Sequence, residues 1–405
     1  MSDLRHTWQT RYVTQVILKV ASRCNLNCSY CYVYNMADST WKMRPALMSD
    51  EVFDAALERI SQQCRATGQD RFRIAFHGGE PCLIGPDTFD AWCGRARAVL
   101  GEIVHLSLVI QTNGTLLDSQ WIDSLLKHQV SVGISMDGPK EIHDAVRIDH
   151  LEQGSYERVE RGLKLLQAAK VPYGVGCVIP LGADPLTVHH HFLRLGCDQI
   201  TYLMPHFTHD TIAPIRERYG ATPCADFLIP IFEDWWFEST MEVQIDDLKN
   251  VARVIMGGQS HSEAIGNDPP GYVFIEPDGE MEGLDNLRAC ADGLSRIKLN
   301  VRHSDFFDLL TTETMHSQAI FEGMPLSKTC RDCPEVGTCG GGYLPHRYSS
   351  ARGFDNPSVW CADLLKLFAH VRNRMGVSVE ETNERRRKLA AKHVPDLDAV
   401  GTHVF

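Results

Sequence analysis

The hydrophobic positions of the first 240 residues alternate between two periods. Short β-branched runs, typical of buried strands, are each followed by a longer stretch whose apolar positions recur with helical spacing. The runs predict strands at residues 13–20, 71–76, 105–111, 130–135, 173–179 and 199–204. The longer stretches predict helices at residues 50–66, 88–100, 119–128, 155–169, 185–195 and 225–238. Six strand–helix pairs predict an α/β fold whose parallel sheet curves into a partial (β/α)6 barrel with the helices outside.

Polar or glycine-rich turns follow these strands. A cysteine-rich loop follows the first strand, and His-Gly-Gly-Glu-Pro at 77–81 follows the second. Thr-Asn-Gly at 112–114 follows the third, and Met-Asp-Gly-Pro at 136–139 follows the fourth. Because the carboxyl ends of parallel strands share one edge of a sheet, we expect these turns on one rim, where binding sites form.

The strand–helix repeat stops between residues 240 and 270. Glycine and proline clusters there indicate loops, and a short strand at 272–276 is followed by a hairpin turn at 277–280. The sequence therefore predicts a barrel domain at 1–240, a linker at 241–269, a second domain at 270–365 and a helical tail at 366–405.

Composition and charge exclude several classes of function. The 405 residues can bury two cores, and the net charge of −12 argues against a nucleic-acid partner. No apolar run reaches 18 residues and the first residues lack a signal peptide, so we expect no membrane partner and a cytoplasmic location. In such a reducing compartment, clusters among the 14 cysteines indicate metal binding or catalysis and not disulfides.

Three of the cysteines, Cys24, Cys28 and Cys31, lie within eight residues. Thiolates at this spacing can hold three corners of a [4Fe–4S] cluster and leave the fourth iron open to a ligand. A zinc site fits less well, because structural zinc usually shows paired cysteine knuckles. The loop resembles the CxxxCxφC loop of the radical S-adenosylmethionine (SAM) superfamily, with Tyr30 at the aromatic φ position. This resemblance implies that SAM binds the open iron.

The rim turns also resemble the SAM site of that superfamily. The turn of Gly78, Gly79 and Glu80 resembles its GGE motif, whose carbonyls and carboxylate would accept hydrogen bonds from the SAM amine. Glycine permits such a close approach of the backbone. Further contacts are implied to the ribose and carboxylate of SAM by Thr112 and Asn113, to its carboxylate by Arg147, and to adenine by the backbone at Val178. A surface charge at a helix end is an equally good interpretation of Arg147.

A second cysteine set lies in the C-terminal part, at Cys330, Cys333, Cys339 and Cys361. Four thiolates suffice for a fully ligated [4Fe–4S] cluster or for a structural zinc ion, and the spacing excludes neither. The segment resembles the SPASM domain, a cysteine-rich extension of radical SAM enzymes that modify peptides and that holds two auxiliary clusters.

The second set departs from the full SPASM pattern at one of its two clusters. Tyr343 stands where the pattern has a cysteine, and upstream only Cys290 remains. In the family, the missing ligands all belong to the first auxiliary cluster. We therefore expect one auxiliary [4Fe–4S] cluster, held by the four cysteines of the second set.

Two longer stretches, at 31–41 and 339–364, resemble the radical SAM/SPASM maturases that form three-residue cyclophanes, and most of all the maturases of Gly-rich-repeat peptides. The resemblance covers about residues 13–365. It implies an oxidoreductase that takes hydrogen from a side-chain Cβ of a ribosomally made precursor peptide and joins that carbon to an aromatic ring. It also implies an electron donor such as flavodoxin or ferredoxin.

The crosslinking reaction has to remove a proton, and the sequence offers two candidate bases, Asp285 and Asp137. Each also reads as an ordinary loop or turn carboxylate. Because 23 residues precede Cys24, we expect the peptide to dock on the catalytic domain, on the SPASM-like domain or on a separate partner.

Two other functions compete with crosslinking. One is a sulfatase-type maturase that oxidises Ser or Cys to formylglycine, but such enzymes resemble the full two-cluster SPASM pattern, which Tyr343 interrupts. The other is a non-catalytic iron–sulfur or zinc scaffold. The open-iron trio and the Gly-Gly-Glu turn of residues 78–80 favour an enzyme over a scaffold.

Overall fold

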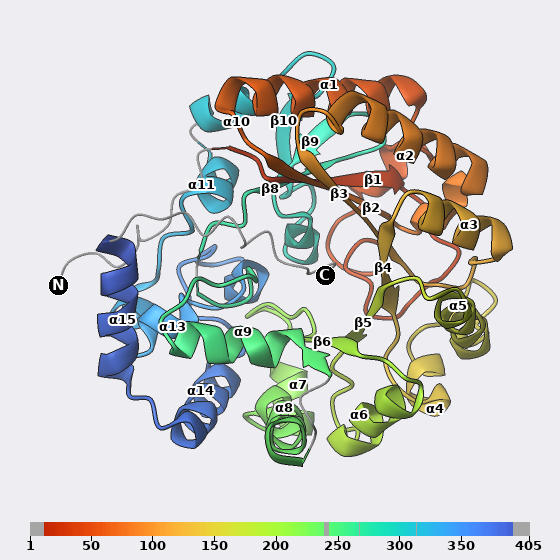
Figure 1. The fold of residues 1–405 in the computed structure, drawn as a ribbon. Coiled ribbons are helices and arrows are strands. Elements are labelled where there is room, and N and C mark those ends of the chain that lie inside the picture. Colours follow the sequence, from red (N-terminus) through yellow and green to blue (C-terminus); the bar gives the residue numbers. More distant parts are fainter. Residues whose placement is uncertain (1–11, 239–242, 267, 313, 392–405) are drawn as a thin grey trace.

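A computed structural model describes residues 12–238, 243–266, 268–312 and 314–391. Its centre is a single ten-stranded sheet in the order β10-β9-β8-β1-β2-β3-β4-β5-β6-β7. Neighbouring strands from β8 through β1 to β7 pair in parallel, and β9 and β10 are antiparallel to their neighbours. The predicted α/β fold with a partial barrel is therefore confirmed (Figure 1).

The strands of the barrel lie close to their predicted positions. Their bounds are β1 Gln15–Ala21, β2 Arg71–Gly78, β3 His105–Thr112, β4 Val130–Ser135, β5 Tyr173–Val178, β6 Gln199–Leu203 and β7 Gln244–Ile245. The remaining strands are β8 Tyr272–Ile275, β9 Glu280–Glu282 and β10 Arg296–Asn300. Both faces of the central strands are covered, which is why they read as nearly continuous apolar runs.

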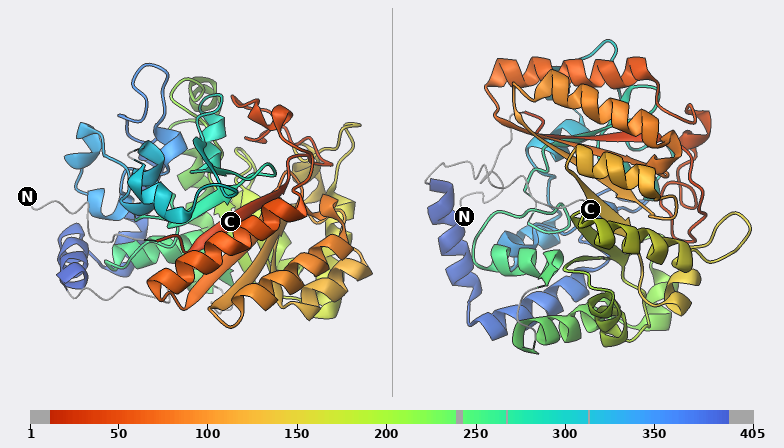
Figure 2. Two further views of the ribbon diagram at one scale, coloured as in Figure 1. Left: turned by 90° about the horizontal axis from the view of Figure 1, so that it is seen from above. Right: turned by 45° about the vertical axis from the view of Figure 1, so that its right-hand side comes forward.

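Helices cover the outer face of the barrel, and Figure 2 shows the first ones packed side by side along the sheet. They are α1 Asp50–Thr67, α2 Pro86–Leu100, α3 Ser119–Lys127, α4 Lys140–Asp144, α5 Tyr156–Ala169, α6 Pro185–Arg194, α7 Ala213–Tyr219 and α8 Pro223–Glu233. Local signals fix their ends: Ser49 and Asp118 cap the first turns of α1 and α3, and Gly68 ends α1 in the left-handed conformation.

The C-terminal part is built from short elements and two longer helices. They are α9 Asp246–Ile255, α10 Phe306–Thr311, α11 Met315–Phe321, α12 Lys328–Arg331, α13 Val336–Cys339, α14 Cys361–Met375 and α15 Val379–Ala391. Among the described residues, no helix is long and apolar enough to cross a membrane.

Two predicted boundaries were wrong. The range 241–269, expected as a linker, contains β7, which extends the barrel sheet beside β6, and the amphipathic helix α9. The segment expected to begin a separate domain at residue 270 instead places β8 directly beside β1 in the same sheet. The repeat was missed here because β7 has only two residues. Of the predicted tail at 366–405, residues 392–405 lie outside the described part.

A buried carboxylate fastens the C-terminal part to the barrel. Asp363 lies on α14, two residues after Cys361, and is fully buried. Its Oδ1 accepts hydrogen bonds from the backbone N–H groups of Cys224 and Ala225 at the start of α8, and its Oδ2 pairs with Arg216 at 3.2 Å. The helix that begins with a predicted cluster ligand is therefore held against the barrel by a satisfied buried charge.

Replacing Asp363 with Ala should lower the free energy of unfolding by about 3 kcal/mol, because two buried N–H groups and Arg216 lose their acceptor. Chemical denaturation of the two proteins measures this difference. Asp355→Ala is the control, since Asp355 is an exposed carboxylate whose ion pair with Arg352 is exposed as well. Equal losses in both variants would contradict the account.

Candidate functional site

The cysteine loop lies on the rim formed by the carboxyl ends of the strands, directly after β1. A second rim segment holds its backbone in place: the N–H of Asn27 donates to the carbonyl of Ile148 at 2.7 Å, and the N–H of Ser29 donates to that of Val146 at 2.9 Å. These bonds extend the loop across the mouth of the barrel and fix the spacing of the thiols.

The thiols of Cys24, Cys28 and Cys31 have the chemistry that a [4Fe–4S] cluster requires. Burial raises the pKa of all three thiols, Cys28 and Cys31 raise that of Cys24 further, and Cys31 raises that of Cys28 further. The cations Lys19 and Arg147 act in the opposite direction on Cys31 and favour its thiolate. Iron binding would displace the thiol protons, and Lys19 and Arg147 would stabilise the thiolates that result. Three such thiolates fit a [4Fe–4S] cluster that keeps one iron without a protein ligand.

Two glycines bring the next turn against this loop. A Cβ at Gly78 would overlap the carbonyl oxygen of Ala21, and a Cβ at Gly79 would overlap the carbonyl of Arg23 and the hydroxyl of Tyr34. The backbone of the turn therefore lies in contact with the residues that enter the cysteine loop, which only glycine permits. The role of this turn as the cradle for the SAM amine stays a prediction.

Glu80, predicted to contact SAM, also links the loops of the rim. Its buried carboxylate accepts hydrogen bonds from the Thr112 hydroxyl at 2.6 Å and from the backbone N–H of Asn113 at 2.8 Å. Asn113 in turn donates to Asn25 of the cysteine loop at 2.8 Å. These three expected SAM contacts thus also join the loops after β1, β2 and β3.

Asp137, one of the two candidate bases, is bound on both oxygens. Its Oδ1 accepts from the backbone N–H of Val178 at 3.0 Å, and its Oδ2 pairs with Arg147 Nε at 2.8 Å and accepts from the Tyr30 hydroxyl. The Arg147 guanidinium also lies over the Tyr30 ring. Arg147 is buried, so its interpretation as a surface charge was wrong.

Asp285, the other candidate base, lies in the floor of the site. Its Oδ2 is 2.6 Å from Lys19 Nζ, in the middle of β1, and accepts a hydrogen bond from the Tyr32 hydroxyl at 2.9 Å. Burial alone would raise the pKa of Asp285, but Lys19, His77 and Arg288 outweigh it, and the pKa lies below its ordinary value. Asp285 is therefore a carboxylate at neutral pH.

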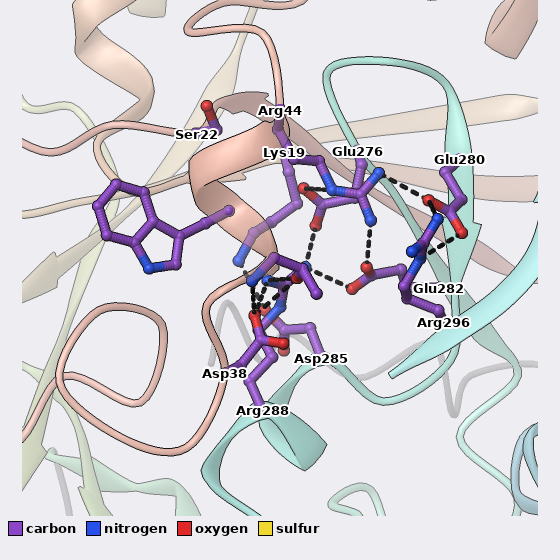
Figure 3. Close-up of polar contacts among 12 residues, drawn as sticks. Lys19, Ser22, Asp38, Arg44, Glu276, Glu280, Glu282, Asp285, Arg288 and Arg296 are labelled. Carbon is purple, nitrogen blue, oxygen red and sulfur yellow. Dashed lines mark hydrogen bonds and ion pairs between the residues drawn. The ribbon is translucent and has the colours of Figure 1, made fainter. Parts of the chain in front are cut away.

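A buried charge network holds the residues around Asp285 (Figure 3). Arg288 pairs with Asp38 at 2.7 Å and with Glu282 at 2.6 Å, and Arg44 pairs with the other oxygen of Glu282 at 2.6 Å. These five charged side chains, Glu276 included, are almost completely buried. The network connects the segment after the cysteine loop to the β8–β9 hairpin that precedes Asp285.

The second cysteine set also converges. Burial is the main cause that raises the pKa of the Cys339 thiol to about 12, and Cys361, Cys330 and Cys333 raise it further. Among the described residues, no group of three His, Cys, Asp or Glu side chains is placed for a single metal ion. A [4Fe–4S] cube holds its thiolates further apart than one ion does, so the four thiols stay the predicted ligands of an auxiliary cluster.

The residues around Tyr343 do not form a further set of thiolates. Tyr343 donates to Glu263, and its oxygen accepts from Asn286. Tyr272 donates to the other oxygen of Glu263. Cys290 lies apart and donates to the carbonyl of Pro345 at 3.6 Å.

Sequence reasoning missed Lys19, Tyr32, His77, His206 and Glu263. Lys19 carried a usable signal, because a lysine within the buried run of β1 requires a buried partner. Tyr32 follows a cluster ligand directly, and His77 precedes the glycine turn, but nothing in their spacing indicates a contact with Asp285. Glu263 and His206 lie in loops whose positions depend on the sheet order.

Comparisons with known proteins agree with this geometry. Residues 18–195 match the model of the Radical SAM superfamily. The chain is 26% identical to the cysteine-type anaerobic sulfatase-maturating enzyme of Clostridium perfringens, over 89% of this chain and 96% of that protein. It is 24% identical to the serine-type enzyme of Bacteroides thetaiotaomicron, over 88% of each.

Solved structures show the same fold. The structure of "anSMEcpe with bound AdoMet and Cp18Cys peptide" matches 91% of this chain and 98% of that one, with a TM-score of 0.74 and 24% identity. Streptococcus suis SuiB bound to precursor peptide SuiA matches 87% of this chain and 77% of that one, with a TM-score of 0.58 and 11% identity. Residues 18–195 thus carry a radical SAM region, and the protein is an enzyme whose cofactors are a [4Fe–4S] cluster and SAM.

Replacing Gly79 with Ala should lower the free energy of unfolding by about 2 kcal/mol or more, because the added Cβ has no room against Arg23 and Tyr34. It should also reduce the iron held by Cys24, Cys28 and Cys31. Denaturant titration and iron analysis after anaerobic reconstitution measure both effects. Gly94→Ala is the control: a Cβ there is 3.8 Å from its nearest neighbour, so that variant should match or exceed the parent in stability.

Reconstituted protein should contain about 8 iron atoms per chain, in two [4Fe–4S] clusters. Replacing Cys24, Cys28 and Cys31 together with Ala should leave about 4, and Cys290→Ala should leave the full content. About 12 iron atoms would contradict the missing first auxiliary cluster, and about 4 iron with one zinc would instead favour zinc at the second set.

Proposed function

We propose that this enzyme modifies a ribosomally made peptide by removing hydrogen from a side-chain Cβ and joining that carbon to an aromatic ring. The observation that carries the proposal is the buried carboxylate of Asp285, held as an anion by Lys19 on the same rim as the cysteine loop. The aromatic ring that gains the new bond has to lose a proton, and a positioned carboxylate is a suitable acceptor.

In this proposal, the rim loops bind and orient the cofactors and the substrate, and Asp285 accepts the proton. When the cluster and SAM are bound, they supply a 5′-deoxyadenosyl radical that takes a hydrogen atom from the substrate. The rim residues bind and orient: the loops joined by Glu80, Thr112 and Asn113 shape one wall, and the Asp137–Arg147 pair fixes another. Asp285 lies between β1 and the C-terminal part, where the peptide would reach it.

The overall reaction balances with one base and one electron acceptor. A Cβ–H bond breaks by transfer of a hydrogen atom, and a Cβ–C(ring) bond forms. The ring C–H bond then breaks, its proton passes to Asp285, and one electron leaves. An iron–sulfur cluster at Cys330, Cys333, Cys339 and Cys361 would be the acceptor for that electron. We expect an external donor, such as flavodoxin or ferredoxin, to supply the electron that starts the reaction.

Asp285 fits the role of base better than Asp137. Both oxygens of Asp137 are held by Val178, Arg147 and Tyr30, and its place is on the barrel side of the rim. The contacts of Asp285 all lie on Oδ2. Its Oδ1 accepts no hydrogen bond from the described residues, which leaves one oxygen to receive a proton.

Formylglycine formation is the second candidate, and the similarity to cysteine-type and serine-type anaerobic sulfatase-maturating enzymes favours it. Both candidate reactions need a peptide, a radical SAM site and a base. They differ in the C-terminal part, where Tyr343 replaces a cysteine of the two-cluster pattern and binds Glu263 and Asn286. This replacement supports crosslinking.

Mass spectrometry of the peptide encoded next to the gene, after co-expression with the enzyme, separates the two reactions. Crosslinking predicts a loss of two hydrogens, with fragmentation suppressed between an aromatic residue and a nearby aliphatic residue. A peptide that carries formylglycine at Ser or Cys would refute crosslinking.

Replacing Asp285 with Asn should abolish the modified peptide, with a loss of at least about 100-fold in rate, while SAM cleavage continues. The amide keeps the shape of the side chain but accepts no proton at neutral pH. Anaerobic assays of modified peptide and of 5′-deoxyadenosine measure the two steps separately. Asp292→Asn, an exposed neighbour that binds Ser39, is the control. Full product formation by the Asp285 variant would remove Asp285 from the mechanism.

The pH profile should depend on Lys19. The pKa of Asp285 lies below its ordinary value, so the basic form persists at neutral pH and is lost only as the pH falls through that lowered pKa. Lys19→Met removes the nearest cation and leaves burial, His77 and Arg288, so the acid limb of product formation should move to higher pH. An acid limb that stays at the parent value would show that Lys19 does not control the base.

A further inference from the structure

Four aromatic side chains form a continuous surface next to Asp285, which we call the aromatic wall: Tyr32, His206, Tyr343 and His346. Their ring centroids are 5.4 Å apart for Tyr32 and His206, 5.6 Å for His206 and Tyr343, and 5.2 Å for Tyr343 and His346. Tyr32, His206 and Tyr343 are each only half-buried. Part of each of these three residues is therefore accessible, and a further ring would pack against them at the usual contact distance.

Three separate segments supply the aromatic wall. Tyr32 follows the last cysteine of the radical SAM loop, and His206 follows β6. Tyr343 and His346 come from the segment after Cys339 of the second cysteine set. No one of these segments would place four rings together, so the wall exists only where the barrel rim meets the C-terminal part.

Three buried polar atoms at the wall have no hydrogen-bond partner among the residues that the structure describes. They are Nδ1 of His206, Nε2 of His346 and Oδ1 of Asn286. Burial lowers the pKa of His206 to about 4 and that of His346 well below its ordinary value, so both rings are neutral, and each can donate one hydrogen bond through one nitrogen and accept one through the other. Buried polar groups are nearly always paired in native proteins, so three unpaired ones together indicate a polar ligand.

The wall is contiguous with the proposed base. The Tyr32 hydroxyl donates to Asp285, and the Tyr32 ring contacts the His206 ring. Asn286 is the next residue after Asp285 and donates to Tyr343. A ring lying on the wall would therefore be adjacent to the carboxylate that has to take its proton.

We propose that the aromatic wall is the subsite for the aromatic residue of the peptide, with His346 and Asn286 binding the main-chain amides beside it. The identification of that bound residue as the radical acceptor rests on the proposed crosslinking function. The ligand class is a short extended peptide with a flat side chain. Its ring would add to the row of ring contacts, and the Oδ1 of Asn286 would accept a peptide N–H.

The proposal is tested by binding in the absence of turnover. The probes are two capped pentapeptides of glycine that differ only in a central tryptophan or alanine. Their affinities for the reconstituted enzyme with SAM, under anaerobic conditions and without reductant, are measured by saturation-transfer NMR. We expect the tryptophan peptide to bind about tenfold more tightly or better.

Two kinds of variant separate the two parts of the subsite. Tyr343→Leu should remove most of the preference for tryptophan, whereas Tyr343→Phe keeps the ring and should retain it. His346→Phe and Asn286→Leu should weaken both peptides by about tenfold and leave their ratio unchanged, since they remove amide contacts. His128→Gln is the control, a buried histidine on the outer side of the barrel that binds Asp90.

Equal affinity of the parent enzyme for the two peptides would overturn the subsite, and this result does not depend on any variant folding. A full tryptophan preference in Tyr343→Leu with unchanged iron content would overturn it as well. A crosslinked natural product without tryptophan preference would defeat only this inference. A formylglycine product with the preference intact would defeat only the crosslinking function.

Discussion

The ion pair between Lys19 and Asp285 is the contact on which the site depends. Lys19 lies in the middle of β1, which is paired with β2 on one side and β8 on the other. Asp285 follows the β8–β9 hairpin. Because both charges are buried and 2.6 Å apart, removing either one would strand the other in a low-dielectric interior at a cost of about 3–5 kcal/mol. The pair therefore fixes the C-terminal part against the strand that leads into the cysteine loop.

The surrounding charges extend this constraint. Arg44 and Arg288 share Glu282, and the network adds to the backbone hydrogen bond that Asp38 donates to Arg288 between their two segments. Buried carboxylates outnumber buried cations here, and the pKa of Glu276 is raised to about 7, first by burial and then by Glu282. A proton shared by Glu276 therefore offsets part of the excess negative charge, and Glu276 keeps its contacts with Arg288 and Arg44. The result is a rigid floor beneath the rim, which a reaction through free radicals requires.

The sequence predicts the barrel well, because its signals are local. The apolar run that becomes β4 and the caps of α1 and α3 are read within a few residues, and so is the Cys24–Cys31 loop. The same holds for the four cysteines of the second set, which are close in sequence or follow a recognisable spacing. The resemblance to a known superfamily then gave the prediction that the turn at Gly78 and Gly79 contacts SAM.

The rest of the site could not be predicted, because it depends on how distant segments pair. Asp285 was a candidate among loop carboxylates, and only the β1–β8 pairing brings it to Lys19. From the sequence, Asp137 was as good a candidate for the base as Asp285, but in the fold both of its carboxylate oxygens are bound. The contact of Tyr343 with Glu263 joins residues 80 positions apart, and neither residue type signals the other. Contacts between distant segments determine where these side chains lie, and patterns over a few neighbouring residues do not reveal such contacts.

The central claim is that a peptide Cβ becomes bonded to an aromatic ring whose proton passes to Asp285. The most direct measurement uses a precursor peptide in which every aromatic ring is fully deuterated, with high-resolution mass spectrometry of the product. The account predicts that the product loses one ring deuterium together with one aliphatic hydrogen. A product that keeps every ring deuterium would contradict it.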